Sequence, residues 1–205
     1  MRGAPGVVMV STSTATRGGV ASYVRMLRGT ALWETWRVEH IASHRDGGRV
    51  AKAGVFACAV PRYMAALVRR PFLVHLHMAS NGSFVRKAIL FWLAWALRVP
   101  AVVHLHGAEF HLFHSRLPRP LRAVVRATLT RAAVVVALGD RWAGELTAIA
   151  PAARVVPLPN AVRVPAAVRP AGGRPRVVFL GEIGDRKGAF VLLDAWAQLV
   201  AAGEV

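Results

Sequence analysis

Two H-x-H pairs are the first residues in the sequence whose spacing suits chemistry. They are His75-Leu76-His77 and His104-Leu105-His106. Residues two apart in a strand share one face, and both pairs fall at the carboxyl ends of predicted strands, where open α/β sheets bind their ligands. His106, which Gly107 follows directly, is the strongest candidate for contact with a ligand.

Four histidines in two pairs raise the question of a zinc site, which in proteins is built from His, Cys and carboxylate ligands. No thiol joins these histidines at ligand spacing, and Glu109 is the only carboxylate near them in the sequence. We therefore expect no metal and no other cofactor. The alternative for His75 and His104 is a polar strand end that is hydrogen-bonded to the backbone.

A glycine-containing loop near the N-terminus suits an anionic ligand. Thr16-Arg17-Gly18-Gly19 lies between an apolar run at 7–10 and a predicted helix at 20–27. Glycine lets backbone N–H groups approach a ligand, and a helix N-terminus favours an anion. The loop is not G-x-G-x-x-G, so it predicts no dinucleotide site. The alternative is an ordinary turn.

A second loop of this kind runs from Gly181 to Gly188 and ends in the adjacent cations Arg186 and Lys187. A Gly-containing loop with two cations at a helix start suits a diphosphate. The alternative is a solvated helix end. Cations oppose the helix dipole at that position, which favours a role in ligand binding.

The elements that must position these residues alternate along the chain. Strands are predicted at 7–10, 71–77, 101–106, 132–138 and 155–160, and helices at 20–27, 84–97, 120–131 and 140–149. Continuous apolar strands that alternate with helices indicate a parallel sheet with helices on both faces, so we expect a Rossmann-like α/β domain. Residues 30–60 have a less clear pattern, in which we expect one or two more strands.

The composition changes after residue 163, where the first domain, 1–163, is expected to end. Residues 164–175 are rich in Pro, Gly and Ala and predict a linker. Residues 176–180 predict a buried strand, and 187–200 an amphipathic helix. One strand and one helix cannot bury their own apolar faces. We therefore expect 176–205 to be the start of a second Rossmann-like domain.

The positive charge is confined to the first part of the chain. The net charge is +17, and residues 1–170 carry 23 basic and 6 acidic side chains, whereas 171–205 carry four of each. This asymmetry indicates an anionic partner, which is a membrane, a nucleic acid or a phosphorylated substrate. The alternative is a genome whose base composition favours Arg codons.

Arg119, Arg122 and Arg126 lie on one face of a predicted helix whose other positions are largely apolar. A basic amphipathic helix suits an anionic membrane surface. The alternative is a solvated face on a helix that packs on the core.

The single cysteine, Cys58, cannot form an internal disulfide, which fits a reducing cytosol. It lies in an apolar run and is expected to be buried. No signal peptide is evident, and the longest apolar run, 88–97, is far shorter than the roughly 20 residues of a membrane span. We expect a cytoplasmic protein that is at most peripheral on the inner face of the cell membrane.

Five motifs in order resemble those of the GT-B glycosyltransferases of family 4, also called glycosyltransferase group 1. They are GGV, HLHMASNGSFVRK, VVHLHGAEF, PLPNAV and VVFLGEIGDRKGAFVLLDAW. The resemblance extends from Val7 to the last residue. It implies two Rossmann-like domains that face each other across a cleft, the first binding the acceptor and the second binding a nucleotide sugar. It also implies sugar transfer with retention and without a metal.

The resemblance also implies roles for single residues. His106 would lie beside the transferred sugar and hydrogen-bond one of its hydroxyls. The donor diphosphate would be bound by Gly18, Gly19, Gly181, Arg186 and Lys187. The acceptor side of the cleft would include Arg17, His77, Asn81 and Glu109. The acceptor would be a polysaccharide or a lipid-linked or membrane-associated glycan.

Two departures from the family pattern bear on activity. Glu182 stands where the family usually has Arg, and its charge would repel a diphosphate. The family's paired glutamates would lie beyond position 205, so the isolated chain is expected to bind the donor poorly and to be inactive. A non-catalytic GT-B remnant is one alternative. A basic nucleic-acid-binding module is another, but the chain lacks a reader motif and its Trp and Tyr do not interleave with Arg.

Overall fold

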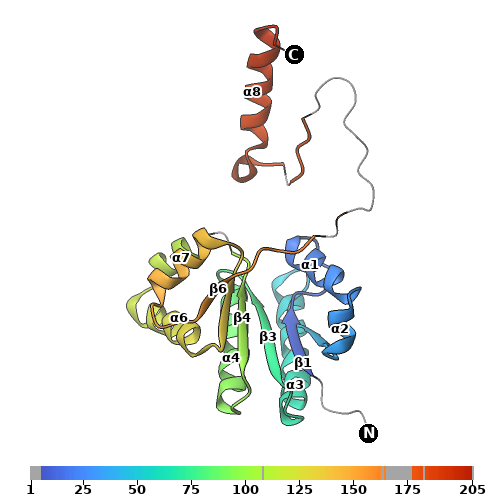
Figure 1. The fold of residues 1–205 in the computed structure, drawn as a ribbon, viewed down its shortest axis with the longest axis vertical. Coiled ribbons are helices and arrows are strands. Elements are labelled where there is room, and N and C mark those ends of the chain that lie inside the picture. Colours follow the sequence, from blue (N-terminus) through green and yellow to red (C-terminus); the bar gives the residue numbers. More distant parts are fainter. Residues whose placement is uncertain (1–5, 108, 163, 165–176, 182, 205) are drawn as a thin grey trace. The chain divides into compact units, whose positions relative to one another are not determined.

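The computed structural model describes residues 6–107, 109–162, 164, 177–181 and 183–204. The chain divides into two compact units, 1–163 and 164–205, and each is described here by itself. Figure 1 shows the first unit as a sheet with helices packed around it.

The first unit is built on one six-stranded sheet in which all pairings are parallel and the strand order is β2-β1-β3-β4-β5-β6. The strands are β1 (Val7–Ser11), β2 (Glu39–Ala42), β3 (Leu73–Met78), β4 (Ala101–Leu105), β5 (Val134–Ala137) and β6 (Val155–Pro157). This architecture confirms the predicted Rossmann-like α/β fold. Residues 30–60 contribute one strand, β2.

Seven helices of the first unit fall within the described residues. They are α1 (Gly19–Arg28), α2 (Ala31–Thr35), α3 (Arg49–Val68), α4 (Gly82–Ala96), α5 (Phe110–Arg116), α6 (Arg119–Arg131) and α7 (Asp140–Ile149). The four predicted helices correspond to α1, α4, α6 and α7, with ends that differ by at most two residues. Helices α2, α3 and α5 were not predicted from the sequence.

The alternation of side chains along the strands separates an apolar face of the sheet from a histidine face. On β3, Val74 and Leu76 belong to the buried cluster that also contains residues of α3 and α4. His75 and His77 point to the opposite face, where the ring of Tyr23 from α1 lies 5.9 Å from that of His77. The histidines are therefore held between the sheet and α1.

Helix α4 supports the end of the sheet where the predicted ligand residues lie. Its buried residues recur every three or four positions, as on one face of a helix: Phe84, Lys87, Ala88, Leu90, Phe91 and Ala94. The segment after the helix places Arg98 in the left-handed region with φ 57°. Pro100 follows and cannot continue a helix. Apolar spacing thus fixes α4 on the sheet.

Helix α3 is long and apolar enough, by length and composition alone, to cross a membrane. In the structure it packs against β2 and α4. The buried Tyr63 hydroxyl donates a hydrogen bond to the carbonyl oxygen of Leu90 at 3.1 Å. Core helices satisfy the same criterion, so the length of α3 is weak evidence for a span.

Cys58 is exposed on α3, so the expectation that it would be buried is wrong. The buried positions of this helix include Ala59, Tyr63 and Ala66. Cys58 precedes Ala59 by one residue, which turns its side chain about 100° around the helix axis. The apolar run that contains Cys58 is therefore only partly turned toward the core.

In the second unit the expected buried strand is not formed by its described residues, 177–180, which are exposed and unpaired. A strand needs a neighbour for its N–H and C=O groups. The expected helix is confirmed as α8 (Ala189–Ala201), which follows the 3-10 turn η1 (Asp185–Lys187). Its apolar side chains Phe190, Leu193 and Trp196 remain exposed. The predicted linker, except Val164, lies outside the described residues.

Two leucines on α6 provide a test of which face of this helix supports the fold. Leu129 is 0% exposed and Leu121 is 49% exposed. We expect Leu129→Ala to lower the free energy of unfolding by about 2–5 kcal/mol, because it leaves a cavity in the core. Leu121→Ala should cost less than about 1 kcal/mol. Urea unfolding followed by circular dichroism measures both, and equal losses would contradict this packing.

Candidate active site

The carboxyl ends of β1, β2, β3 and β4 bring their following loops to one edge of the sheet. Two backbone hydrogen bonds tie these loops together across strands. The Ser13 N–H donates to the His44 carbonyl oxygen at 2.7 Å, and the His106 N–H donates to the Met78 carbonyl oxygen at 2.8 Å. Polar side chains that are distant in the sequence therefore converge at this edge.

The two H-x-H pairs form one continuous cluster on the sheet. Parallel pairing places His77 beside His104. The Nε2 atom of His75 lies 3.3 Å from Nδ1 of His104, and Nδ1 of His77 lies 2.8 Å from Nε2 of His106. The structure thus brings all four histidines together. Among the described residues, the bond that His75 and His104 form is with each other.

The histidine cluster is neutral near pH 7. Burial, and then the charges of His104, His75 and Lys87, lower the pKa of His106 to about 3. Burial likewise lowers the pKa of His75 to about 3 and that of His104 to about 4. It also lowers the pKa of His77 well below its usual value. His106 is therefore suited to hydrogen bonding with a hydroxyl and not to carrying a charge.

The bond between His77 and His106 determines what His106 can offer a ligand. In a neutral imidazole one nitrogen donates and the other accepts, so one of the two rings donates and the other accepts. No described residue bonds to Nδ1 of His106, which remains able to bond a hydroxyl group. Nε2 of His77 and Nε2 of His104 are buried without a partner among the described residues.

His75, His77 and His104 each offer a nitrogen, and these atoms lie within 4.8 Å of one another, close enough to be considered for a metal ion. The charged groups near these histidines do not favour a bound metal ion. No carboxylate is among the causes of the His75 and His77 pKa values, and Lys87 adds positive charge near His77. The absence of a metal stays a prediction.

Lys87 on α4 is a functional candidate that the sequence reasoning missed. Its side chain is buried, and its one hydrogen bond among the described residues is to Ser83 Oγ at 3.5 Å. Burial, and then the charge of Arg86, lower the pKa of Lys87 to about 7. No described carboxylate pairs with Lys87. Its position in the first turns of a helix that follows a strand end was the signal available in the sequence.

The first glycine loop has the conformation that its residue types predict. Gly18, at the N-terminus of α1, has φ 123°, which L side chains rarely adopt. Gly19 is exposed with open space around it. The N–H of Arg17 donates to Oδ2 of Asp46 at 3.0 Å, which joins this loop to the one after β2. The loop therefore lies at the edge of the sheet that carries the histidines.

Asn81 and Glu109, predicted for the acceptor side, line one hollow of about 190 Å³ together with Arg116. Gly107, just before this loop, approaches Ser80 so closely that a Cβ atom there would lie 3.1 Å from Ser80 Oγ. The loops after β3 and β4 are therefore in contact, and a larger residue than Gly107 would require Ser80 to shift by a few tenths of an ångström.

The remaining donor residues belong to the second unit. Gly181 and Lys187 are exposed, and Lys187 ends η1 just before Gly188, which has φ 73°. The side chain of Arg186 and the whole of Glu182 lie outside the described part of the chain. The approach of Lys187 to His106 stays a prediction.

Comparison with known families adds one finding. The sequence model of the Glycosyl transferase 4-like domain matches residues 7–161. The chain belongs to this family. The matched segment contains all six strands and every first-unit residue predicted for the site, and it confirms the family resemblance for the first four motifs, the fourth of them up to residue 161. A search of curated proteins gave no match.

The lowered pKa of the buried Lys87 amine can be measured directly. The chain has three lysines, Lys52, Lys87 and Lys187, so carbon-13 labelling of lysine gives a simple NMR titration. We expect one signal to titrate near pH 7, and Lys87→Met to remove it. Burial penalises the charged form, so the free energy of unfolding should rise from pH 7 toward 10 in the native chain but not in Lys87→Met. Three signals that all titrate above pH 10 would contradict the burial.

The histidine cluster predicts loss of stability in mild acid. Each buried ring has a folded-state pKa below the unfolded value of about 6.5. The unfolded chain therefore binds more protons between pH 6.5 and 4, and the free energy of unfolding should fall as the pH is lowered through this range. Urea unfolding at several pH values measures how steeply the free energy of unfolding depends on pH. His75→Gln should reduce the number of protons taken up on unfolding by about one. A flat profile from pH 6.5 to 5 would contradict a neutral cluster.

Proposed function

We propose that residues 7–161 form the acceptor-side domain of a retaining, metal-free GT-B glycosyltransferase that uses a nucleotide-sugar donor. The observation that supports this most directly is the family match over the unit that brings His106, His77, Asn81 and Glu109 to one edge. A hydrogen-bonding imidazole next to a polar hollow suits a sugar and an acceptor hydroxyl.

In the proposed reaction the acceptor hydroxyl oxygen bonds to the anomeric carbon of the donor sugar, and its proton passes to an oxygen of the leaving diphosphate. The bond from that carbon to the nucleoside diphosphate breaks, and the diphosphate leaves with the electron pair. His106 is neutral and holds a hydroxyl of the transferred sugar. Lys187, with Arg186, neutralises the charge that develops on the leaving diphosphate.

The domain organisation is part of the proposal. Residues 1–163 are the acceptor domain, 164–175 are a linker, and 176–205 begin the donor domain. Support comes from the division of the chain after Arg163. The apolar side chains exposed on α8 suit a helix that is covered by further parts of a donor domain.

We place the protein in the cytoplasm, with its acceptor at the inner face of the membrane. Arg119 and Arg126 are exposed on α6, and Arg122 is half-buried between them. None of the three forms an ion pair with a described residue. Unpaired guanidinium groups on one helix are available to the phosphates of an anionic bilayer.

The activity test uses the chain joined to a complete donor domain and measures release of nucleoside diphosphate from a panel of nucleotide sugars. His106→Ala and Lys187→Ala should each reduce kcat by about 100-fold or more. The first variant loses a contact that positions the sugar, and the second loses a cation that stabilises the charge on the leaving diphosphate. Cys58→Ser, on the exposed side of α3, is the matched control and should leave kcat unchanged.

Near-normal turnover in both site variants would reject the assignment of the two residues. Absence of diphosphate release with every donor, from a folded protein, would favour the non-catalytic alternative. NMR of the product anomer tests retention separately, since inversion would contradict the proposed class.

A further inference from the structure

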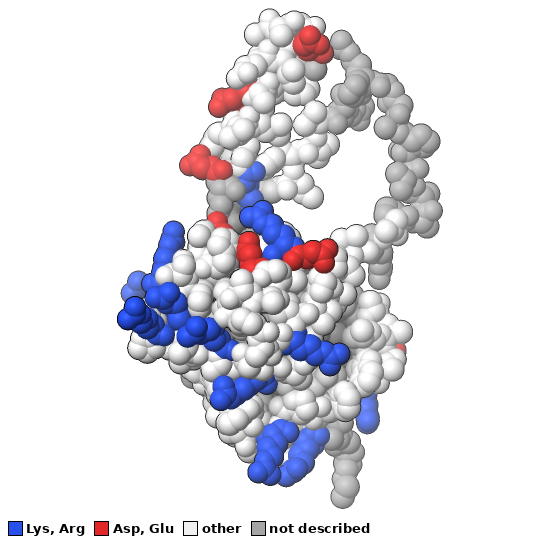
Figure 2. All heavy atoms as spheres, turned by 60° about the vertical axis from the view of Figure 1, so that its left-hand side comes forward, with Lys and Arg blue, Asp and Glu red and all other residues white. Residues whose placement is uncertain are grey.

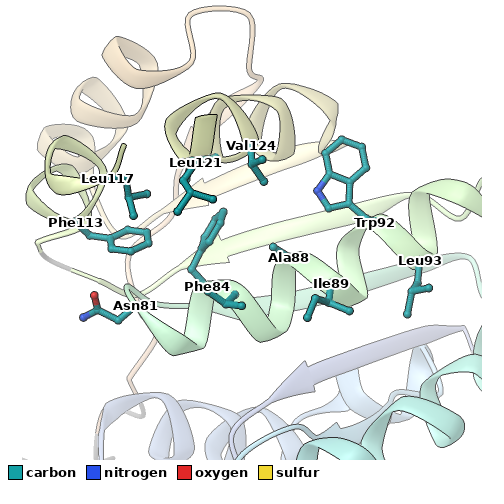
Figure 3. A pocket seen from close by; sticks show the side chains of 12 residues that line it. Asn81, Phe84, Ala88, Ile89, Trp92, Leu93, Phe113, Leu117, Leu121 and Val124 are labelled. Atoms are coloured by element: carbon teal, nitrogen blue, oxygen red, sulfur yellow. The ribbon is translucent and has the colours of Figure 1, made fainter. Parts of the chain in front are cut away.

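An apolar groove on the first unit has no role in the reaction described above. It has a volume of about 560 Å³ and lies between α4 and α6, with residues of α5 at one end. Figure 3 shows the side chains that line it: Phe84, Ala88, Ile89 and Trp92 rise from α4, and Leu121 and Val124 descend from α6. This volume is typical of a pocket for a small organic molecule.

The groove is continuous with the candidate active site. Its lining includes Asn81, Phe113 and Leu117, and these three residues also line the polar hollow that contains Glu109 and Arg116. From Asn81 to Trp92 the groove follows α4 for about 16 Å, at the usual rise of 1.5 Å per residue. One end is therefore polar and lies at the edge of the sheet, and the other end is apolar and extends away from it.

The charged side chains on the three helices that form the groove are all basic, whereas the adjoining polar hollow contains Glu109 as well as Arg116. The described residues of α4, α5 and α6 include no Asp or Glu, but they carry seven basic side chains: Arg86, Lys87, Arg116, Arg119, Arg122, Arg126 and Arg131. Figure 2 shows Lys and Arg side chains gathered on this side of the molecule. The guanidinium group of Arg131 lies 5.5 Å from the ring centre of Trp92. These charges favour an occupant with an anionic group.

A second copy of the chain is a poor occupant for this groove. A two-fold interface requires a surface that is complementary to itself, and two concave grooves leave a void between them. Two such faces would also bring their arginines together, which costs energy. A slender hydrocarbon chain fills a narrow groove without either penalty.

We infer that the groove between α4 and α6 binds the hydrocarbon chain of a lipid-linked acceptor whose head group is anionic. The inference rests on the proposed function and specifies its acceptor. The chain lies along Ala88 and Trp92, and the head group lies at Arg116 and Asn81. The sugar-accepting hydroxyl of the head group is thereby held at the edge of the sheet that carries His106.

The test uses the 205-residue chain without any nucleotide sugar and the probe ω-bromoundecanoate, a monomeric anionic chain with bromine at its far end. Bromine quenches tryptophan on contact, so the probe should quench Trp92 in a saturable manner. Trp92→Phe should abolish most of the quenching. The uncharged ω-bromoundecanol should bind at least about 10-fold more weakly, since it lacks the charged pair with Arg.

Two variants alter the groove in different ways. Ile89→Trp narrows it at a position that is 46% exposed, and Val124→Glu places a charge on its exposed wall; each should weaken probe binding by at least 10-fold. Val124 is 43% exposed, so its replacement should not impair folding, which circular dichroism checks. Val50→Glu makes the same change on α3, at a position that is 87% exposed, and should bind the probe as the native chain does.

Several results would overturn the inference. Unchanged quenching in both groove variants would place the probe elsewhere, as would quenching that persists in Trp92→Phe. Binding to phosphatidylglycerol vesicles but not to the monomeric probe would indicate a bilayer surface contact instead. A change of mass in sedimentation velocity that Val124→Glu abolishes would indicate a second copy.

The outcome is independent of the transferase assay. Probe binding without diphosphate release in the completed enzyme would leave a lipid site in a protein of other function. Diphosphate release without probe binding would leave a glycosyltransferase whose acceptor does not use the groove.

Discussion

The parallel direction of all six strands is the constraint on which the arrangement of this domain depends. Each strand enters from the same side, so the loops after β1, β2, β3 and β4 emerge at one edge. The hydrogen bonds of the ladder then fix which side chains meet there, and a shift of one residue between β3 and β4 would turn the histidines of one strand to the apolar face. The register that sets His77 beside His104 thus also sets the contact between His77 and His106.

Charge at this edge is controlled by burial more than by pairing. The described ion pairs of Arg69 with Glu39 and of Arg141 with Glu145 include no residue of the histidine cluster. Lys87 and the four histidines instead lose hydration without gaining a carboxylate. Such groups become neutral easily, and they interact strongly with any anion that enters, because little water competes with it. A phosphate near Lys87 would restore the charge of its amine.

Much of this fold was readable from the sequence, and the failures have identifiable causes. Strands such as β3 and β4 are continuous apolar runs that Gly or Pro bounds, which is the pattern of a buried parallel strand. Strand β2 lies at the sheet edge and contains Glu39 and His40, so it lacks that pattern. Helix α3 is apolar on several sides and contains Pro61, which obscured its period.

The histidines were assigned to one face from spacing alone. The burial of Lys87 depends on tertiary packing, and adjacent Arg86 made the position look like a solvated basic segment.

The preference for arginine over lysine on this surface has a consequence for binding. Of 27 basic residues only three are lysines, and arginine keeps its proton at any pH that a folded protein survives. The attraction of the domain for anions should therefore hardly vary with acidity over the neutral and alkaline range. Dissolved salt acts differently, since at 0.15 M the field of an exposed charge is screened within about 8 Å. Association of this domain with any anionic surface would thus be governed by ionic strength, and cellular salt would limit the attraction to surfaces that are already close.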